Sequence, residues 1–175
     1  RRWGTSMIDD MHDAVEWAVA EGLADTNRVC VYGASYGGYA ALQSVVRYPD
    51  RYRCTVGYAG LYSMDLWMSD SDVAKHASGQ NYQKSVFPED ATERAAQSPA
   101  MQVEKIRVPV MLVHGEKDQR VPISQFKLLK SALVTAGKPP EVEIVEAGEG
   151  HGFYDHDNQV RLYTRMQQFF DQHHR

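Results

Sequence analysis

The sequence predicts an α/β fold in which parallel strands alternate with helices that cover both faces of one sheet. Short apolar runs typical of buried strands are separated by stretches in which apolar residues recur at helical spacing. Turn signals near residues 49–50 and 137–140 fall between the two kinds of segment. We expect right-handed crossovers to connect the strands. The predicted strands are residues 28–32, 54–59, 108–114 and 141–146.

Helical periodicity begins close to the start of the chain. Apolar residues recur there every three or four positions, and the pattern ends near Gly22. The same spacing predicts three further helices, at residues 36–47, 123–136 and 158–172. The residues that define the first helix are Met7, Ile8, Met11, Ala14, Val15, Ala18 and Val19.

Ser35 lies between the first predicted strand and the helix that follows it. Gly-x-Ser-x-Gly in this setting is typical of a nucleophile elbow, a strained turn that points the serine hydroxyl outward. We expect Gly33 and Gly37 to be required, because a side chain at either position would collide across so tight a turn. The pattern indicates a nucleophilic serine.

Two later loops supply partners for this serine. Asp118 lies in His-Gly-Glu-Lys-Asp-Gln-Arg-Val-Pro after the strand at 108–114, and His151 lies in Gly-His-Gly-Phe after the strand at 141–146. Both loops leave the carboxyl ends of parallel strands, the edge at which ligands bind in an open α/β sheet. The order Ser, Asp, His is the one found on such a sheet. The sequence therefore predicts a catalytic triad.

Residues 61–100 interrupt the alternation of strands and helices. This polar and aromatic segment contains Trp67, Tyr82 and Phe87, and we expect it to form a helical excursion over the edge that carries the triad.

Together, Gly-Ala-Ser-Tyr-Gly-Gly-Tyr-Ala and the two loop motifs resemble the catalytic domain of the prolyl oligopeptidase family. The pattern is most similar to its dipeptidyl peptidase and acylaminoacyl peptidase branches, and the resemblance runs from about Trp3 to the C-terminus. It implies an α/β-hydrolase fold, of which residues 1–175 would form the C-terminal half. The N-terminal strands of the sheet would then lie upstream of residue 1.

The resemblance also implies a mechanism. No cofactor is expected, and no metal, because no cluster of His, Cys and carboxylate residues has the spacing of a zinc site. Ser35 attacks the carbonyl of a peptide substrate, His151 transfers the proton, and Asp118 orients the imidazole, which gives an acyl-enzyme. The backbone N–H of Tyr36 is one expected oxyanion donor. The second donor in this family is a tyrosine hydroxyl from a loop that would lie upstream of residue 1, so we expect the 175-residue chain alone to be weakly active.

Substrate contacts follow from the same resemblance. Leu61, Met64 and Trp67 are expected to form apolar walls, although a packing role in the core is an equal alternative. Arg120 is expected to reach a substrate carbonyl, and Tyr36 and Val121 to close the pocket. The alternatives to a peptidase are a carboxylesterase or thioesterase on the same fold, and a catalytically inactive fragment or partner subunit.

Truncation of the sheet would expose the strand at 29–32 as a bare edge. Such an edge is expected to pair with the absent N-terminal part or with a second copy of the chain. Among the other histidines, we expect His114 to be structural and His156 to lie on the surface at a helix start.

Composition excludes several other classes of protein. A net charge of −4 without a basic stripe argues against nucleic-acid binding, and no apolar run is long enough to suggest a membrane span. Cys30 and Cys54 are too few for a disulfide scaffold, and we expect them to be buried thiols. The sequence does not decide between a cytoplasmic, periplasmic or secreted location.

Overall fold

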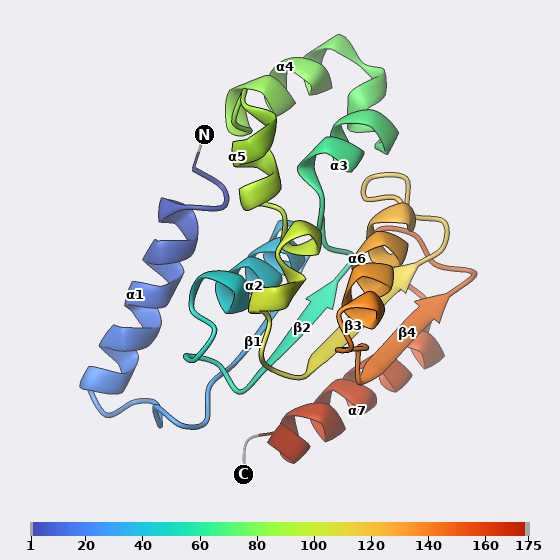
Figure 1. Cartoon of the computed structure of the whole chain (residues 1–175). Coiled ribbons are helices and arrows are strands. Elements are labelled where there is room, and N and C mark those ends of the chain that lie inside the picture. The colour runs from blue at the N-terminus through green and yellow to red at the C-terminus, as the bar shows by residue number, and fades with distance from the viewer. Residues whose placement is uncertain (1, 174–175) are drawn as a thin grey trace.

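A computed structural model describes residues 2–173 of the chain and contains one parallel sheet of four strands. The strands lie in the order β1-β2-β3-β4, so each strand neighbours the next one in the sequence (Figure 1). Residues 1, 174 and 175 of the expected domain lie outside the described part. The strands are β1 (Cys30–Ala34), β2 (Cys54–Tyr58), β3 (Val110–Gly115) and β4 (Val142–Glu146).

Helices occupy the connections between strands. Helix α2 has the bounds predicted for it, and α6 and α7 differ from theirs by one or two residues. The first strand differs most, because it continues up to the residue before Ser35. The helices are α1 (Ser6–Ala20), α2 (Tyr36–Arg47), α3 (Met64–Asp70), α4 (Ala77–Val86), α5 (Ala91–Ala96), α6 (Ser124–Thr135) and α7 (His156–His173), with short 3-10 helices η1 (Val73–Lys75), η2 (Pro99–Met101) and η3 (Val103–Lys105).

Both faces of the sheet are covered, and successive side chains along a strand point to opposite faces. Val110 and Leu112 of β3 pack with apolar residues of α2 and α6 on one face. Met111 and Val113, one residue out of phase, pack with α7 on the other face. Figure 1 shows α2 and α6 on one side of the sheet and α7 on the other. This is the α/β architecture that the sequence predicts.

A third apolar cluster lies beyond the carboxyl ends of the strands, under the segment that interrupts the alternation. Figure 1 shows α3, α4 and α5 gathered there, above α2 and β2. The cluster joins this segment to α1 and α2, so that it is packed onto the domain. Its buried members are Ile8, Tyr39, Ala40, Leu61, Met64, Trp67, Phe87 and Val121.

The cysteine prediction was wrong, because Cys30 and Cys54 form a disulfide. They are 24 residues apart in sequence, but the register of β1 and β2 places them directly opposite each other. Their Cα atoms are 4.7 Å apart, within the range that a disulfide spans. Sequence spacing alone does not reveal such a pairing, because it depends on which strands are neighbours.

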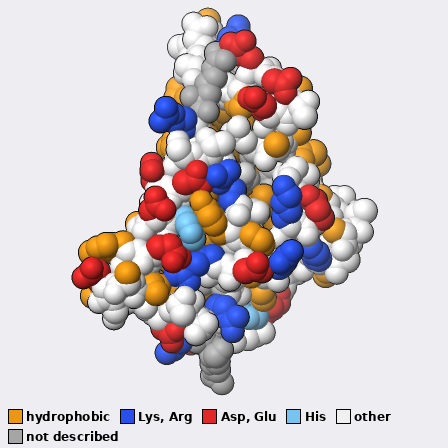
Figure 2. Space-filling view, turned by 60° about the vertical axis from the view of Figure 1, so that its left-hand side comes forward, with side chains coloured by type: hydrophobic (Ala, Val, Ile, Leu, Met, Phe, Trp, Pro, Cys, Tyr) orange, Lys and Arg blue, Asp and Glu red, His pale blue; other side chains and the backbone are white. Residues whose placement is uncertain are grey.

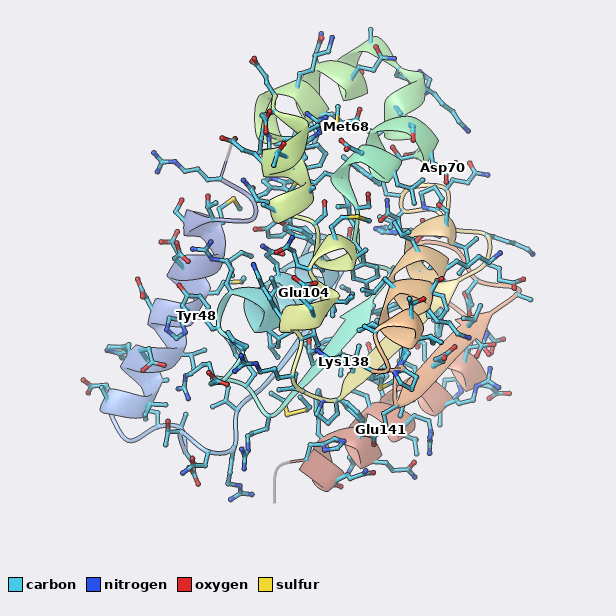
Figure 3. All side chains as sticks on the ribbon, viewed as in Figure 1. Tyr48, Met68, Asp70, Glu104, Lys138 and Glu141 are labelled. Carbon is cyan, nitrogen blue, oxygen red and sulfur yellow. A yellow bond between two sulfur atoms is a disulfide. The ribbon has the colours of Figure 1, made fainter. Side chains whose placement is uncertain are left out.

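Polar contacts fasten the ends of the elements. Lys138 Nζ donates to the carbonyls of Glu104 (2.7 Å) and Ile106 (2.8 Å), and Glu141 before β4 accepts from Gln172 near the end of α7 (2.8 Å; Figure 3).

The face in Figure 2 carries basic and acidic side chains intermixed. In residues 2–173, no helix combines the length and apolarity that crossing a membrane requires.

His114 on β3 is fully buried. Its Nε2 lies 2.7 Å from the carbonyl oxygen of Val121, so Nε2–H donates there, and it lies 3.5 Å from Asp118 Oδ2. Burial lowers the pKa of the imidazole below its ordinary value of 6.5, while the carbonyl and the Asp118 charge oppose the shift. His114 is therefore a neutral, structural residue in the fold.

This lowered pKa predicts a pH-dependent stability. Above pH 6.5 neither the folded nor the unfolded chain binds a proton at His114, so its contribution is constant. Below that pH the unfolded chain takes up the proton first, and the free energy of unfolding falls by up to about 1.4 kcal/mol per pH unit until the folded pKa is reached. Urea unfolding of the wild type and of His114→Gln, at pH values from about 5 to 7.5, measures the difference in slope. Equal slopes would contradict the assignment.

Candidate active site

Ser35 lies in a strained turn between β1 and α2. Its φ of 57° and ψ of −120° are rare for a residue with a side chain, and such a conformation costs on the order of 1–3 kcal/mol. Backbone bonds on both sides hold the turn: Ser35 N donates to Tyr58 O (2.9 Å), and Tyr39 N donates to Ser35 O (3.1 Å). The surrounding fold thus maintains a conformation that the residue alone would avoid.

Two glycines make this turn sterically possible, but they are not both the expected ones. A Cβ on Gly33 would lie 2.2 Å from Gly37 O, which confirms the need for glycine there. A Cβ on Gly37 would meet nothing within 4 Å beyond its chain neighbours and the adjacent backbone of α2, so the collision expected there was wrong. The second restricted position is Gly38, where a Cβ would lie 2.7 Å from Tyr58 O, because α2 begins directly against the end of β2.

Ser35, His151 and Asp118 are connected by hydrogen bonds. Ser35 Oγ lies 2.8 Å from His151 Nε2, and His151 Nδ1 lies 2.7 Å from Asp118 Oδ2. The Asp118 carboxylate is buried, with its other oxygen accepting from Val121 N (2.9 Å). These side chains come from loops that follow β1, β3 and β4. The arrangement allows a proton to pass from the hydroxyl to an imidazole whose tautomer is fixed by a carboxylate.

The loop that carries His151 is held by the carboxylate of Glu149. One oxygen accepts from Tyr154 N (2.9 Å), and the other from Asp155 N (3.0 Å) and Asn158 Nδ2 (2.8 Å). Hydrogen bonding, first from Asn158 and then from Tyr154, lowers the pKa of Glu149, so it accepts as a carboxylate. Sequence reasoning missed Glu149; its position two residues before the histidine and close to a helix start was the available signal.

The His151 loop also lies directly against the end of β3. Lys117 N donates to Glu149 O (2.8 Å), and a Cβ on Gly115 would lie 2.3 Å from Gly150 O. A larger residue at position 115 would push the two loops apart. Gly115 therefore permits the approach that brings Asp118 and His151 together.

The backbone N–H of Tyr36 is placed beside the serine. Tyr36 is the first residue of α2, and the first N–H groups of a helix have no partner within it. They point out of the positive end of the helix, where a developing negative charge is favoured. Residue 36 can therefore supply one oxyanion donor.

An apolar cavity of about 620 Å³ opens beside Ser35. Five of the six predicted substrate or oxyanion residues line it, while Met64 is fully buried in the cluster behind it. Sequence reasoning did not assign Trp3, Met7, Val73 or Tyr82 to this cavity, because they come from segments that only the fold brings together. The predicted residues in the lining are Tyr36, Leu61, Trp67, Arg120 and Val121.

The segment 61–63, of which Leu61 lines the cavity, is fixed by one buried amide. Gln125 of α6 accepts from Tyr62 N and Ser63 N (both 2.8 Å) through Oε1 and donates to Ser63 O (2.9 Å) through Nε2. Trp67 is fixed in turn, because its Nε1–H donates to Arg120 O (2.7 Å). Nothing in the helical pattern distinguished Gln125 as a residue with this role.

No group of three or more His, Cys, Asp or Glu residues suited to hold a metal occurs among residues 2–173.

Comparison with known proteins places this geometry in a family. The family model described as prolyl oligopeptidase family matches residues 1–175. Dipeptidyl aminopeptidase BIII of Pseudoxanthomonas mexicana is 29% identical over 160 residues, which cover 89% of this chain and 23% of that protein. The acylamino-acid-releasing enzyme of Rattus norvegicus is 27% identical over 140 residues, covering 75% and 19%.

Solved structures agree with these relatives. A crystal structure of puromycin hydrolase matches 98% of this chain and 26% of its own, with 26% identity and a TM-score of 0.87. The chain thus spans less than a quarter of the length of these two curated relatives. Its sheet corresponds to the C-terminal part of the α/β-hydrolase domain found in peptidases of this family. The chain belongs to the prolyl oligopeptidase family of serine peptidases.

Proposed function

We propose that this chain carries the catalytic triad of a serine peptidase that hydrolyses peptide bonds of short peptides through an acyl-enzyme. The observation that carries the proposal is the unbroken hydrogen-bond path from Ser35 Oγ through His151 to the buried Asp118 carboxylate. The family membership supports the same chemistry.

In the first step Ser35 Oγ attacks the carbonyl carbon of the substrate while His151 Nε2 takes the hydroxyl proton. The C–N bond then breaks, and His151 delivers this proton to the leaving amine. Asp118 holds the imidazole so that Nε2 faces the serine, and it stabilises the imidazolium. Water repeats the sequence on the acyl-enzyme and releases the acid.

The negative oxygen of each tetrahedral intermediate requires donors. Tyr36 N–H supplies one, and the proposal assigns the second to a part of the protein outside residues 1–175. Loss of one oxyanion donor typically costs about 100- to 1000-fold in turnover. The 175-residue chain is therefore expected to react slowly, as part of a larger catalytic domain.

The lining of the cavity beside Ser35 favours substrates with an apolar residue before the scissile bond. Leu61, Trp67 and Val121 present hydrocarbon surface to it, and burial raises the pKa of Tyr36, so that its ring carries no charge. Proline, alanine or a larger hydrophobic side chain suits such a lining. Arg120 also lines this cavity, and the proposal assigns it contact with a substrate carbonyl.

β1 lies at one edge of the sheet, and this favours pairing with a further strand. Val29 O and Ser35 N bond toward β2, so by alternation the backbone groups of Tyr32 face the open edge. The proposal places here a strand from another part of the polypeptide or from a second copy of the chain.

The catalytic proposal is tested by labelling and turnover. We expect a fluorophosphonate to label Ser35, and Ser35→Ala to abolish labelling and lower the kcat for a peptide anilide by at least about 10⁴-fold. Ser131→Ala, on the exposed side of α6, serves as the control and should react like the wild type. A comparison with a short acyl ester separates peptidase from esterase. Absence of labelling in the folded chain would favour a non-catalytic role.

Glu149 provides a test of positioning. In Glu149→Gln an amide N–H₂ replaces an oxygen that accepts backbone N–H groups, so the His151 loop shifts. Because misplacement of a catalytic group acts on the chemical step, we expect kcat to fall by about 10-fold or more while KM changes little. Glu143→Gln, whose partner is Lys130 on the surface, should leave both constants unchanged. A rise in KM alone would speak against this role.

Edge pairing is tested by light scattering on the isolated chain. We expect dimers or larger species at micromolar concentration, and we expect Tyr32→Pro to shift them towards monomer because proline removes an outward N–H. Tyr32→Thr keeps that N–H and should stay associated. A monodisperse monomeric wild type with nothing bound would overturn the proposal.

A further inference from the structure

A second cavity also opens at Ser35. It measures about 560 Å³, and its lining is polar, in contrast to the apolar cavity. The two share only Ser35 and Arg120. The lining residues of this second cavity are Ser35, Asp72, Lys117, Gln119, Arg120 and His151.

The position of His151, the general acid of the proposed mechanism, indicates which part of a substrate occupies each cavity. His151 must deliver its proton to the leaving amine, so the leaving group lies within reach of His151. His151 lines the polar cavity and Tyr36 lines the apolar one. The acyl part of a substrate therefore occupies the apolar cavity, and the released part occupies the polar cavity.

Among the residues that line the polar cavity, Lys117 and Arg120 carry positive charges and only Asp72 carries a negative one. Arg120 Nε lies 3.0 Å from Asp72 Oδ1, so these two charges compensate each other. The ammonium of Lys117 makes no ion pair within residues 2–173, and its backbone is fixed by the hydrogen bond from Lys117 N to Glu149 O. One cation thus remains next to the site where the amine departs.

Building on the proposed function, we infer that the leaving-group site selects a carboxylate, and that Lys117 recognises it. When the C–N bond breaks, His151 transfers one proton to the amine, and the released residue keeps its own negative charge close to the Lys117 ammonium. The carboxylate is either the free α-carboxylate of a residue at the C-terminus of the substrate or the side chain of an acidic residue there. Short peptides cleaved before their last residue have this feature.

The test compares peptides that share their acyl part and differ after the scissile bond. The three substrates end in glycine with a free carboxylate, in glycinamide, and in aspartic acid amide. Because Lys117 is solvent-exposed, its pairing is worth up to about 1 kcal/mol, and we expect kcat/KM to be about three- to fivefold higher for the charged substrates at low salt.

Two substitutions separate charge from bulk. In Lys117→Met the long stem remains and the charge is lost, so the ratio of kcat/KM should fall to about 1, whereas Lys117→Arg should preserve it. Raising the salt concentration should reduce the wild-type ratio.

The outcomes are distinguishable. A preference for only the free C-terminal carboxylate, or only the acidic side chain, identifies the source of the charge. Hydrolysis of all three substrates at equal rates, or an unchanged ratio in Lys117→Met, overturns the inference and leaves the peptidase proposal standing. No hydrolysis of any substrate together with no labelling of Ser35 overturns both.

Discussion

The close approach of two loops at one edge of the sheet is the constraint on which the candidate site depends. Parallel strands deliver their carboxyl ends to the same edge, so residues far apart in sequence meet there. Within that edge, the loops after β3 and β4 touch because position 115 lacks a side chain and Lys117 N bonds to Glu149 O. Asp118 and His151 share a hydrogen bond only because this contact exists.

Rigidity of the serine has a different origin. Ser35 adopts a positive φ that its neighbours enforce, through Tyr58 O on one side and the start of α2 on the other. The disulfide between Cys30 and Cys54 joins the first residues of β1 and β2, at the end of these strands opposite to the turn. Ser35 is therefore placed by its own backbone, whereas Asp118 and His151 are placed by the approach of their two loops and by side-chain hydrogen bonds within each loop.

The sequence could predict the fold class, the strand order along the chain and the three polar residues, because these follow from local patterns. Apolar runs mark β1 to β4, and the motifs around Ser35, Asp118 and His151 are short and continuous. What could not be predicted depends on which segments become neighbours. Gly38 rather than Gly37 is restricted because α2 meets the end of β2, and only the fold decides between the two roles that the sequence leaves open for Met64, which is buried at the start of α3.

The amide of Gln125 has a consequence for how the molecule responds to acid. An amide does not ionise, and it clamps the backbone of residues 61–63 with bonds that acid leaves intact. The shape of the apolar cavity beside Ser35 is thus insulated from proton concentration.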